Sequence, residues 1–359
     1  MTVDDLTVPY LPQDPRHYRP GLGLVGCGGI SALHLAAYRA AGYDVRVLCD
    51  LVAERAYERQ AEFFPQALVT TDYRDLLAMP EVEVLDIATH VGVRPPIVEA
   101  ALRAGKHVLS QKPFVRSLSE GRRLCDVADE AGRILAVNQN GRWAPHFSYL
   151  RNAVAAGRLG TLTSADFGAY WPHDQIVADS PEFATMSDLI LYDFGIHWFD
   201  LVATLFAGHG AARSVTAHVG RTPGQVIAVA TQAQVLVEFD AAQVSLVFRG
   251  SSRWAESGGY RVDGTAGVLT HAGLSLGGPD LVLVDAAGVH PATVEGDWFA
   301  NGMRGTMGEL LLSIEDGRRP SNEARASLPG LALCYAAVES SRTGLPVDPS
   351  TVDTLAGRD

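Results

Sequence analysis

The chain has 359 residues, of which 47% are hydrophobic and 19% charged, and its formal net charge is −12. This length and apolar content are enough for two domains that each bury a core. The acidic balance, with no run rich in Lys or Arg, argues against nucleic acid and anionic membrane as partners.

Cysteine usage and the start of the chain bear on the compartment. The four cysteines, Cys27, Cys49, Cys125 and Cys334, show neither paired nor metal-like spacing. Such usage is typical of a reduced protein. The N-terminus lacks a basic leader region, and no apolar run is long enough to cross a bilayer. We therefore expect a cytoplasmic protein without a membrane span.

Residues 1–20 contain Pro9, Pro12, Pro15 and Pro20 and have little apolar periodicity. An extended arm lying outside the first sheet and a disordered tail are equally good interpretations of this stretch.

A cluster of small residues follows the apolar run 22–25 and leads into a helical pattern over 32–38, which predicts strand, tight turn and helix. Gly26 can take the backbone angles of the turn, Gly28 lets the main chain approach a pyrophosphate, and Ser31 lets helix and strand pack closely. The amides at the helix N-terminus then face the anion. The predicted cofactor contacts in this turn are Gly26, Cys27, Gly28, Gly29 and Ile30.

A second apolar run, Val45–Cys49, ends in Asp50, about 20 residues beyond Gly28. At that spacing a carboxylate meets the ribose diol of a bound dinucleotide. The glycine pattern alone is weak because the chain has 36 glycines, and a plain strand, turn and helix with an ordinary Asp is the alternative. The two features together predict a dinucleotide-binding domain.

Helical and strand patterns alternate with short connections from Asp50 to about residue 142. This alternation predicts a parallel, doubly wound sheet, and we assign it to a domain over residues 21–142. The predicted helices are 52–64, 72–77, 96–104 and 119–132, and the further strands are 67–69, 82–88, 105–109 and 134–138.

From residue 143 the pattern changes to runs of strands with turn signals. We expect residues 143–359 to form an α+β domain with an open, largely antiparallel sheet, so that the fold class of the chain is α/β. Packing of the C-terminal helix back onto the first domain is left open. The predicted helices are 149–156, 187–206, 298–315 and 327–342, and the strands are 162–170, 214–219, 227–239, 243–249, 259–263, 267–271 and 281–284.

Ser110-Gln111-Lys112-Pro113 follows the fifth strand, at the carboxyl edge where open α/β sheets place ligands. A lysine fixed there by the following proline can point at the nicotinamide face, and desolvation makes its proton easier to lose. A surface lysine in a turn is the alternative, and it is the better one for Lys112 taken by itself.

Asp193 and His197 lie in an apolar stretch with helical pattern. Positions i and i+4 of a helix share a face, so these two side chains would project together from a buried segment. A hydrogen-bonded core histidine is the alternative for a lone His. The acid one turn away and Lys112 at the sheet edge favour a functional site.

Taken together, these residues resemble the glucose-fructose oxidoreductase, inositol dehydrogenase and rhizopine catabolism (Gfo/Idh/MocA) family of oxidoreductases. The resemblance spans about Leu22 to Val347, and the combination of motifs is far more specific than any one of them. It is carried by the glycine-rich turn, Ala100–Val108, Gln111-Lys112-Pro113, Asn138–Arg142, Asp193–His197, Ala336-Ala337 and Gly344-Leu345-Pro346.

The resemblance implies a Rossmann domain, a second domain whose open sheet often mediates oligomers, a tightly held nicotinamide nucleotide, and a cyclic polyol or sugar as substrate. Lys112 matches the family's catalytic lysine, His197 its proton-transferring histidine, and Asp193 the acid that holds substrate. Asp50 matches the acid that favours NAD over NADP.

Three positions depart from the family pattern. Gln111 stands where the family usually has Glu before Lys-Pro, while His90 and Arg94 stand where it commonly has Pro and, four residues later, His. These departures affect the cofactor edge and the charge that a substrate meets, and leave the fold unchanged. The further predicted cofactor contacts are Thr89, His90, Gln111, Lys112 and Asn140.

Aromatic residues near both domains are candidates for a sugar pocket. The stretch Tyr170–His173 follows a strand and offers flat apolar surface and hydrogen bonds, and Arg142 and Trp143 follow the last strand of the first domain. Each is explained equally well by packing. The predicted substrate contacts are Lys112, Arg142, Trp143, Tyr170, Trp171, His173, Asp193 and His197.

The chemistry of alcohol oxidation agrees with these roles. Hydride leaves carbon while the hydroxyl proton leaves oxygen, so a general base must reach the hydroxyl and a cation should stabilise the developing alkoxide. His197 suits the first role and Lys112 the second, and Asp193 can orient the imidazole or a neighbouring hydroxyl. These three are the predicted catalytic residues.

We therefore expect an NAD(H)-dependent oxidoreductase acting on a sugar, inositol or glycoside hydroxyl, with NADP less favoured and the ternary complex formed between the domains. Two alternatives stay open: an oxidoreductase that recycles bound nucleotide between two carbohydrates, and a nucleotide-bound sensor without turnover. The three catalytic candidates together argue against the sensor.

Two features bear on other partners. The outer face of the open sheet is expected to be apolar, which predicts a homo-dimer or homo-tetramer. Gly273-Leu-Ser275-Leu-Gly277 matches the letters of a nucleophile elbow, but no helix pattern follows it, so we interpret it as a glycine-rich turn. No cluster has metal-ligand spacing, and no metal is expected.

Overall fold

The computed structural model describes residues 8–273 and 280–355, and these form two units. The first unit comprises residues 11–143 and 297–328, and the second comprises the described residues of 8–10, 144–296 and 329–355. Residues 1–7 of the expected arm lie outside the described residues. So does the expected turn over 273–277, apart from Gly273.

The first unit is built on a six-stranded sheet in the order β3-β2-β1-β4-β5-β6, and every pair is parallel. The expectation of a parallel, doubly wound sheet is confirmed. Central strands buried on both faces explain why the sequence shows continuous apolar runs. The strands are β1 (Gly21–Val25), β2 (Asp44–Cys49), β3 (Leu68–Thr70), β4 (Val82–Ile87), β5 (His107–Gln111) and β6 (Leu135–Asn138).

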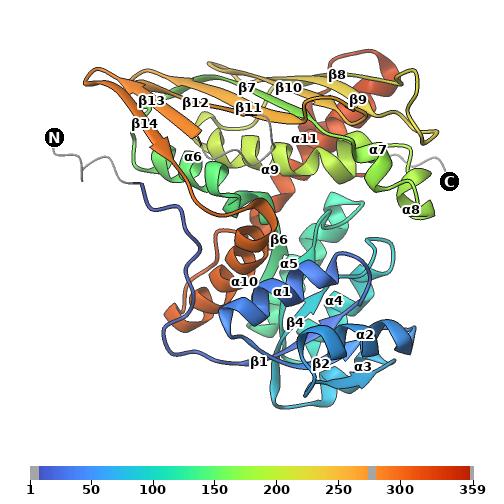
Figure 1. Ribbon diagram of the computed structural model, residues 1–359. Coiled ribbons are helices and arrows are strands. Elements are labelled where there is room, and N and C mark those ends of the chain that lie inside the picture. Colours follow the sequence, from blue (N-terminus) through green and yellow to red (C-terminus); the bar gives the residue numbers. More distant parts are fainter. Residues whose placement is uncertain (1–7, 274–279, 356–359) are drawn as a thin grey trace. The chain divides into compact units, whose positions relative to one another are not determined.

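The helices of the first unit form two groups (Figure 1). In one group α1 (Ser31–Ala41) packs against both α2 (Ala53–Phe63) and α10 (Trp298–Asp316). In the other, α4 (Arg94–Arg103) packs against α3 (Tyr73–Ala78) and α5 (Leu118–Ala131). Side-chain caps set where α3, α5 and α10 begin, because Asp72, Ser117 and Asp297 each accept a bond from a first-turn N–H.

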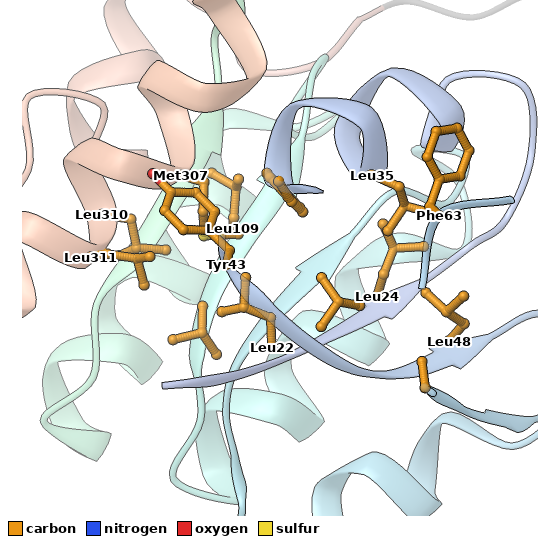
Figure 2. Packing of buried hydrophobic residues seen from close by; sticks show 14 of the residues in the cluster. Leu22, Leu24, Leu35, Tyr43, Leu48, Phe63, Leu109, Met307, Leu310 and Leu311 are labelled. Atoms are coloured by element: carbon orange, nitrogen blue, oxygen red, sulfur yellow. The ribbon is translucent and has the colours of Figure 1, made fainter. Parts of the chain in front are cut away.

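Helix α10 completes the core of the first unit, although it comes about 160 residues after β6 in the chain. Figure 2 shows its side chains Met307, Leu310 and Leu311 facing Leu109 and Leu22 of the sheet, and all five are almost fully buried. The boundary expected at 142/143 therefore needs one amendment: residues 297–328 belong with the first unit, because that unit covers the apolar face of α10.

Residues 11–20 of the arm pack along α10 rather than extending away from it. The carboxylate of Glu315 accepts the backbone N–H groups of His17 and Tyr18, which lower its pKa to about 2. Asp14 pairs with Arg304 of the same helix. Residues 11–20 are therefore fixed to the first unit by named contacts.

The second unit holds an open eight-stranded sheet in the order β14-β13-β12-β11-β7-β10-β9-β8. Only the β7–β10 pair is parallel, so the expected open, largely antiparallel sheet is confirmed. Strand β14 is not among the expected strands, and β9 begins later than the expected residue 227. The strands are β7 (Leu162–Tyr170), β8 (Ser214–Gly220), β9 (Gln232–Glu238), β10 (Gln243–Arg249), β11 (Ser257–Gly264), β12 (Gly267–Gly273), β13 (Asp280–Asp285) and β14 (Gly288–Thr293).

Helices cover one face of this sheet (Figure 1). They are α6 (Pro145–Ala155), α9 (Ile196–Leu205) and most of α11 (Ala324–Thr343), with the short α7 (His173–Ile176) and α8 (Pro181–Ala184) at one side. Short turns of other helix types are η2 (Asn140–Trp143), η3 (Leu189–Phe194), η4 (Ala207–His209) and η5 (Pro349–Thr351). Within residues 8–273 and 280–355, no helix has the length and hydropathy needed to cross a membrane.

The other face of the sheet is mixed rather than apolar. Strand alternation turns Leu236 outward beside Ser245, and the same row continues through Asp166 and Arg261. This corrects the expectation of an apolar outer face, because half-exposed aliphatic side chains there alternate with polar and charged ones. The homo-oligomer accordingly stays a prediction.

Candidate active site

The turn after β1 has the shape that the glycine pattern predicts. Gly26 has a φ of +100°, and a Cβ there would lie 3.0 Å from the main chain of Ala88 and Thr89. Only glycine fits this position without strain. At Gly28 and Gly29 a Cβ would meet nothing within 4 Å, so their main chain borders open space. A ligand can therefore approach the backbone ahead of α1.

Asp50 is tied directly to this turn. Its Oδ2 accepts the Cys27 N–H at 2.8 Å, and its Oδ1 accepts the Val52 N–H at 2.9 Å. The spacing noted in the sequence thus corresponds to a contact between the strand-end carboxylate and the turn. Burial and the neighbouring Asp50 carboxylate raise the pKa of the Cys27 thiol to about 12, so this cysteine stays neutral.

Lys112 lies directly after β5, at the carboxyl edge of the same sheet, and it is partly exposed. The neighbouring Gln111 is buried, and its side chain bonds to two protein groups. Its Oε1 accepts the Lys112 N–H at 2.7 Å, and its Nε2 lies 2.9 Å from Nε2 of His34. Gln111 is thus placed beside Lys112 as expected, but both ends of its amide are engaged by the protein.

Two of the three positions that depart from the family pattern follow β4, His90 in the loop and Arg94 at the start of α4. His90 is exposed, whereas Arg94 is buried and donates to the carbonyl oxygens of Thr89, Gln111 and Pro113. The hydroxyl of Thr89 is buried and has no hydrogen-bond partner among the described residues. A polar atom in that condition, beside Gly26, is available to a ligand.

The residues after β6 lie against α10. Asn140 accepts the indole N–H of Trp298 at 2.9 Å, and the Arg142 guanidinium donates to the Ser321 carbonyl. Trp143 packs so closely on Gly305 that a Cβ there would lie 2.2 Å from the indole. Asn140, Arg142 and Trp143 are therefore all buried against other residues of the first unit.

Gln139 lies within the motif Asn138–Arg142, but the sequence did not predict a role for it. It is 1% exposed, and neither atom of its side-chain amide has a hydrogen-bond partner among the described residues. Its position after β6 puts it at the same sheet edge as Lys112, because β5 and β6 pair in parallel. Its position between Asn138 and Asn140, inside a motif that carries the family resemblance, could have pointed to it from the sequence.

In the second unit, Asp193 and His197 do not share one regular helix. The Gly195 N–H bonds to the carbonyl of Ile190 at 3.1 Å, which is the wider π pattern of η3, and α9 begins only at Ile196. The expected single helix over 187–206 is therefore corrected. A Cβ at Gly195 would lie 2.7 Å from the Leu191 carbonyl oxygen. Single π turns inside helices are frequent at functional sites.

Asp193 is nearly buried and faces His173 of α7, with 3.7 Å between Oδ2 and Nε2. The His173 ring also lies 4.8 Å from the ring of Phe194. These contacts join an acid and two aromatic rings from α7 and η3. Of the predicted stretch Tyr170–His173, His173 is thus the residue that contacts Asp193.

Tyr170 and Trp171 are placed differently. Phe167 and Ala169 of β7 are buried under the helices, so Tyr170 points to the outer face, where its ring covers Gly168. The expected grouping of Tyr170 with Asp193 is therefore corrected, because the sheet separates them. Trp171 follows the strand and donates its N–H to the Arg249 carbonyl at 3.0 Å.

A metal centre and a nucleophilic cysteine are not found among the described residues. No group of three or more His, Cys, Asp or Glu residues there can hold a metal ion. All four cysteines are buried, and burial raises the pKa of each thiol, to about 11 at Cys125 and to about 12 at Cys49. None is a thiolate nucleophile at neutral pH.

Comparisons with known proteins agree with this geometry. Residues 21–139 match the family described as "Oxidoreductase family, NAD-binding Rossmann fold", and residues 147–270 match the GFO/IDH/MocA C-terminal domain. The chain belongs to the Gfo/Idh/MocA oxidoreductase family.

Relatives of this family member include D-apiose dehydrogenase of Paraburkholderia graminis, which is 27% identical over 348 residues covering 93% of this chain and 90% of that protein. A solved oxidoreductase from Agrobacterium radiobacter, in complex with NAD+, L-tartaric acid and magnesium, superposes with a TM-score of 0.83 at 21% identity over 92% of this chain and 99% of that one. Levoglucosan dehydrogenase, solved in complex with NADH and levoglucosan, superposes with a TM-score of 0.78 at 20% identity. The match covers 92% of this chain and 99% of that one. The last two likenesses show the fold.

The first unit of this Gfo/Idh/MocA protein fits NAD. The turn leaves Gly28 and Gly29 open, Asp50 is fixed at the end of β2, and the Thr89 hydroxyl has no protein partner among the described residues. Main-chain amides at the start of α1 would hold the pyrophosphate and Asp50 a ribose diol. Which residues of this turn contact the nucleotide stays a prediction.

Proposed function

We propose that this protein is a cytoplasmic NAD(H)-dependent dehydrogenase that transfers hydride between nicotinamide and the carbon of a secondary hydroxyl in a sugar, inositol or glycoside. The observation that carries the proposal lies in the first unit. One sheet presents, at its carboxyl edge, both the glycine turn with its fixed acid and Lys112. Ligands of doubly wound sheets bind at that edge.

The proposed chemistry needs three side chains. NAD supplies the hydride acceptor in the oxidation direction. Lys112 stabilises the alkoxide that develops as the hydroxyl loses its proton, and His197 takes that proton as general base. Asp193 holds a substrate hydroxyl, and its neighbour His173 orients the carboxylate.

Asp50 is proposed to select NAD over NADP. A carboxylate accepts two hydrogen bonds from a ribose diol but repels a 2′-phosphate. Its two bonds to the Cys27 and Val52 amides hold it in place, which supports a positioned ribose contact. His90, Gln111 and Asn140 remain proposed contacts on the cofactor side, and Arg142, Trp143 and Trp171 remain proposed contacts of the substrate.

The cytoplasmic assignment rests on the cysteines. All four are free and buried, which is the ordinary state of thiols in a reducing compartment.

Cofactor retention and turnover test the proposal together. Native mass spectrometry of the purified protein identifies any nucleotide that it carries. Absorbance of reduced nicotinamide is then followed with NAD+ and a panel that includes D-apiose, levoglucosan and the inositols. We expect NADH formation with at least one member of the panel. Exchange between two sugars on retained nucleotide would instead indicate recycling. Bound nucleotide without reduction by any sugar would indicate a sensor and contradict the proposal.

A further inference from the structure

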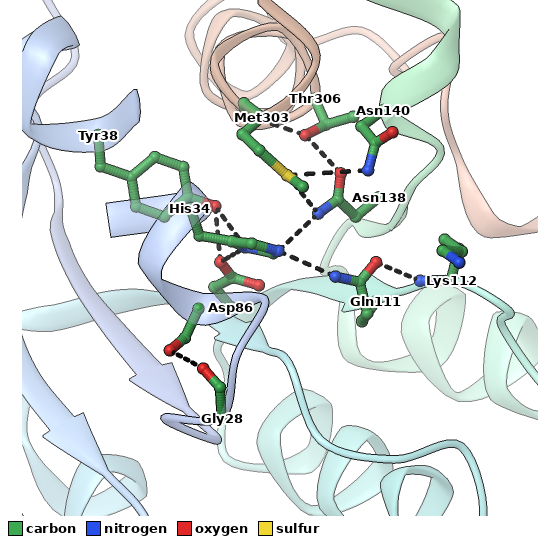
Figure 3. A network of polar contacts seen from close by, with 11 residues as sticks. Gly28, His34, Tyr38, Asp86, Gln111, Lys112, Asn138, Asn140, Met303 and Thr306 are labelled. Atoms are coloured by element: carbon green, nitrogen blue, oxygen red, sulfur yellow. Dashed lines mark hydrogen bonds and ion pairs between the residues drawn. The ribbon is translucent and has the colours of Figure 1, made fainter. Parts of the chain in front are cut away.

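His34 of α1 is the centre of a buried hydrogen-bond network that ends on the main chain of Lys112 (Figure 3). Its Nδ1 lies 2.6 Å from Oδ2 of Asp86, at the end of β4. Its Nε2 lies 2.9 Å from the Gln111 amide and 3.1 Å from that of Asn138. The network thus joins α1 to the ends of three neighbouring strands, β4, β5 and β6.

The bonds fix where the imidazole proton lies. The Lys112 N–H can only donate, so the atom of Gln111 that faces it must be the amide oxygen. The amide nitrogen of Gln111 then faces His34, whose Nε2 must accept. The proton is therefore on Nδ1, where it is donated to Asp86. His34 is a neutral ring with one defined tautomer.

The surroundings leave no substitute for these partners. His34 is 0% and Asp86 is 1% exposed, so the bond between them is shielded from bulk solvent. Tyr38 also donates to Oδ2 of Asp86 at 2.6 Å, and burial together with that carboxylate raises the pKa of Tyr38 well above its usual value. On the other side of the ring, Asn138 accepts from Thr306 of α10 at 2.9 Å. A buried network in which partners are fixed in this way sets geometry tightly.

Arg94 holds the same segment from a second direction. Its guanidinium donates to the carbonyl oxygens of Gln111 and Pro113, the two residues that flank Lys112. It also donates to the carbonyl of Thr89 through two nitrogens, at 3.0 and 2.5 Å. One buried side chain thus fixes the main chain on both sides of Lys112 to the loop after β4.

We propose that His34, in its neutral form with the proton on Nδ1, and Arg94 are positioning residues for Lys112, with His34 acting through Gln111. Only the expected effect on kcat rests on the proposed function, because the positioning of Lys112 can be observed without turnover. The neutral form of His34 also accounts for Gln111 in place of the usual Glu. A carboxylate there would need a proton on Nε2 of His34 and would place an imidazolium between two acids, whereas the amide matches the neutral ring.

The chain makes Lys112 easy to observe. It contains two lysines, and the other one, Lys106, is buried with its ammonium on the carbonyl oxygens of Met79 and Val82. Protein labelled with carbon-13 at the lysine ε position therefore gives two side-chain signals. The Lys106 signal serves as an internal reference. This readout does not depend on turnover, so it separates failure of this inference from failure of the proposed function.

The main variant is Gln111→Met, which keeps the side-chain length and removes both hydrogen bonds. We expect the Lys112 signal to shift and the Lys106 signal to stay. We also expect kcat to fall about 10- to 100-fold, with the NADH dissociation constant within about threefold of the original. His107→Phe is the matched control. It removes the bond to the Ile134 N–H at the other end of β5, and it should move neither Lys112 nor kcat.

Two further measurements complete the test. Nitrogen-15 spectra of the imidazoles, with His34 assigned by its loss in His34→Phe, should show protonation at Nδ1 alone. In Gln111→Glu the same ring should be protonated at both nitrogens, and kcat should recover toward the original value because the carboxylate still accepts the Lys112 N–H. Arg94→Met, which removes the bonds to all three carbonyls without adding a third lysine signal, should also shift the Lys112 signal.

The inference is overturned if the wild-type ring carries its proton on Nε2, or if Gln111→Met leaves both the Lys112 signal and kcat unchanged. It is equally overturned if His107→Phe lowers kcat as much as Gln111→Met, because the effect would then be general destabilisation. If His34→Phe fails to fold, two measurements still decide the question. One is the Lys112 signal in Gln111→Met, and the other is the change in the imidazole spectrum between the wild-type protein and Gln111→Glu.

Discussion

The turn after β1 and the η3–α9 segment are both candidate sites, but the chain builds them in different ways. In the turn, one glycine with a φ of +100° and a main-chain bond from Cys27 to Asp50 define the geometry. Around Asp193, a π turn and the packing of Gly195 against Leu191 and Phe248 define it. Short-range backbone rules account for the first region, and tertiary packing accounts for the second.

This difference has a consequence for how each site responds to change. A nucleotide turn built from backbone amides tolerates side-chain substitution except where a Cβ cannot fit. A site built from side chains on a widened helical turn depends on every neighbour that maintains the turn. Matched substitutions in the two regions, such as Gly26→Ala and Gly195→Ala, should therefore affect NADH binding in the first and kcat in the second.

The largest expected effects come from the two reacting side chains. His197→Asn keeps some hydrogen bonding but removes the titrating base, and Lys112→Met keeps much of the apolar stem but removes the cation. Each should lower kcat roughly 100- to 10,000-fold while NADH still binds. The double variant should lose less than the product of the single losses, because both groups are proposed to act on one hydroxyl. Full turnover in either folded single variant would disprove that residue's role.

Gly26→Ala tests the backbone rule in the nucleotide turn. The new Cβ meets the main chain at Ala88 and Thr89, and the φ of +100° is unfavourable for alanine. Such strain costs about 1–3 kcal/mol, so thermal unfolding should occur several degrees lower and NADH binding should weaken at least about tenfold. Gly29→Ala, whose Cβ meets nothing within 4 Å, is the control for stability. Equal melting temperatures for the two variants would contradict the account.

Asp50→Ala examines cofactor choice in the same region. Removing the carboxylate removes both the ribose contact and the repulsion of a 2′-phosphate, so the preference for NAD should narrow by about tenfold. Calorimetric titration of the wild-type protein and the variant with both nucleotides measures this directly. If the unmodified protein binds NAD and NADP equally well, Asp50 does not select the cofactor.

Much of the first region could be predicted from the sequence. The alternation of strand and helix patterns predicted the parallel sheet. The spacing from Gly28 to Asp50 predicted a carboxylate for a ribose diol, and the bond from the Cys27 N–H to that carboxylate was not expected. His34 was missed because its role depends on Asp86, Gln111 and Asn138, which come from three different strands. Nothing in the local pattern around His34 distinguishes it from a core histidine.

The second region shows where sequence patterns fail. The stretch Leu189–Phe194 is buried throughout, so its apolar pattern cannot distinguish a π turn from an α-helix. The choice depends on the space at Gly195. The helix pattern of α10 was found, but which core it completes depends on long-range packing. Strand β14 was missed because Pro291 interrupts a half-exposed edge strand.

Gly195→Ala is the counterpart of Gly26→Ala in the second region. Its Cβ would lie 2.7 Å from the Leu191 carbonyl oxygen and 3.0 Å from the ring of Phe248, although its φ is ordinary. We expect a loss of about 1–3 kcal/mol in the free energy of unfolding and a lower kcat with unchanged NADH affinity. Denaturant unfolding and NADH fluorescence separate these effects. Weaker NADH binding with normal kcat would contradict the assignment of this turn to catalysis.

The smallest expected effect concerns assembly. A homo-dimer or homo-tetramer that uses the mixed outer face should weaken when Leu236→Glu puts a charge on that face. Leu345→Glu, at an exposed position outside the strands, is the control. Sedimentation should show a smaller species only for the first variant. A wild-type protein that is monomeric at micromolar concentration would rule out the oligomer.

Direct observation of the transferred hydrogen tests the central claim. The panel sugar that is turned over fastest is prepared with deuterium on its secondary carbinol carbons, incubated with NAD+ and the protein, and the reduced nucleotide is analysed by mass spectrometry. Hydride transfer from a carbinol carbon predicts NADH that is one mass unit heavier. Unlabelled NADH, or no NADH from any member of the panel, would contradict the assignment of this chain as a sugar or polyol dehydrogenase.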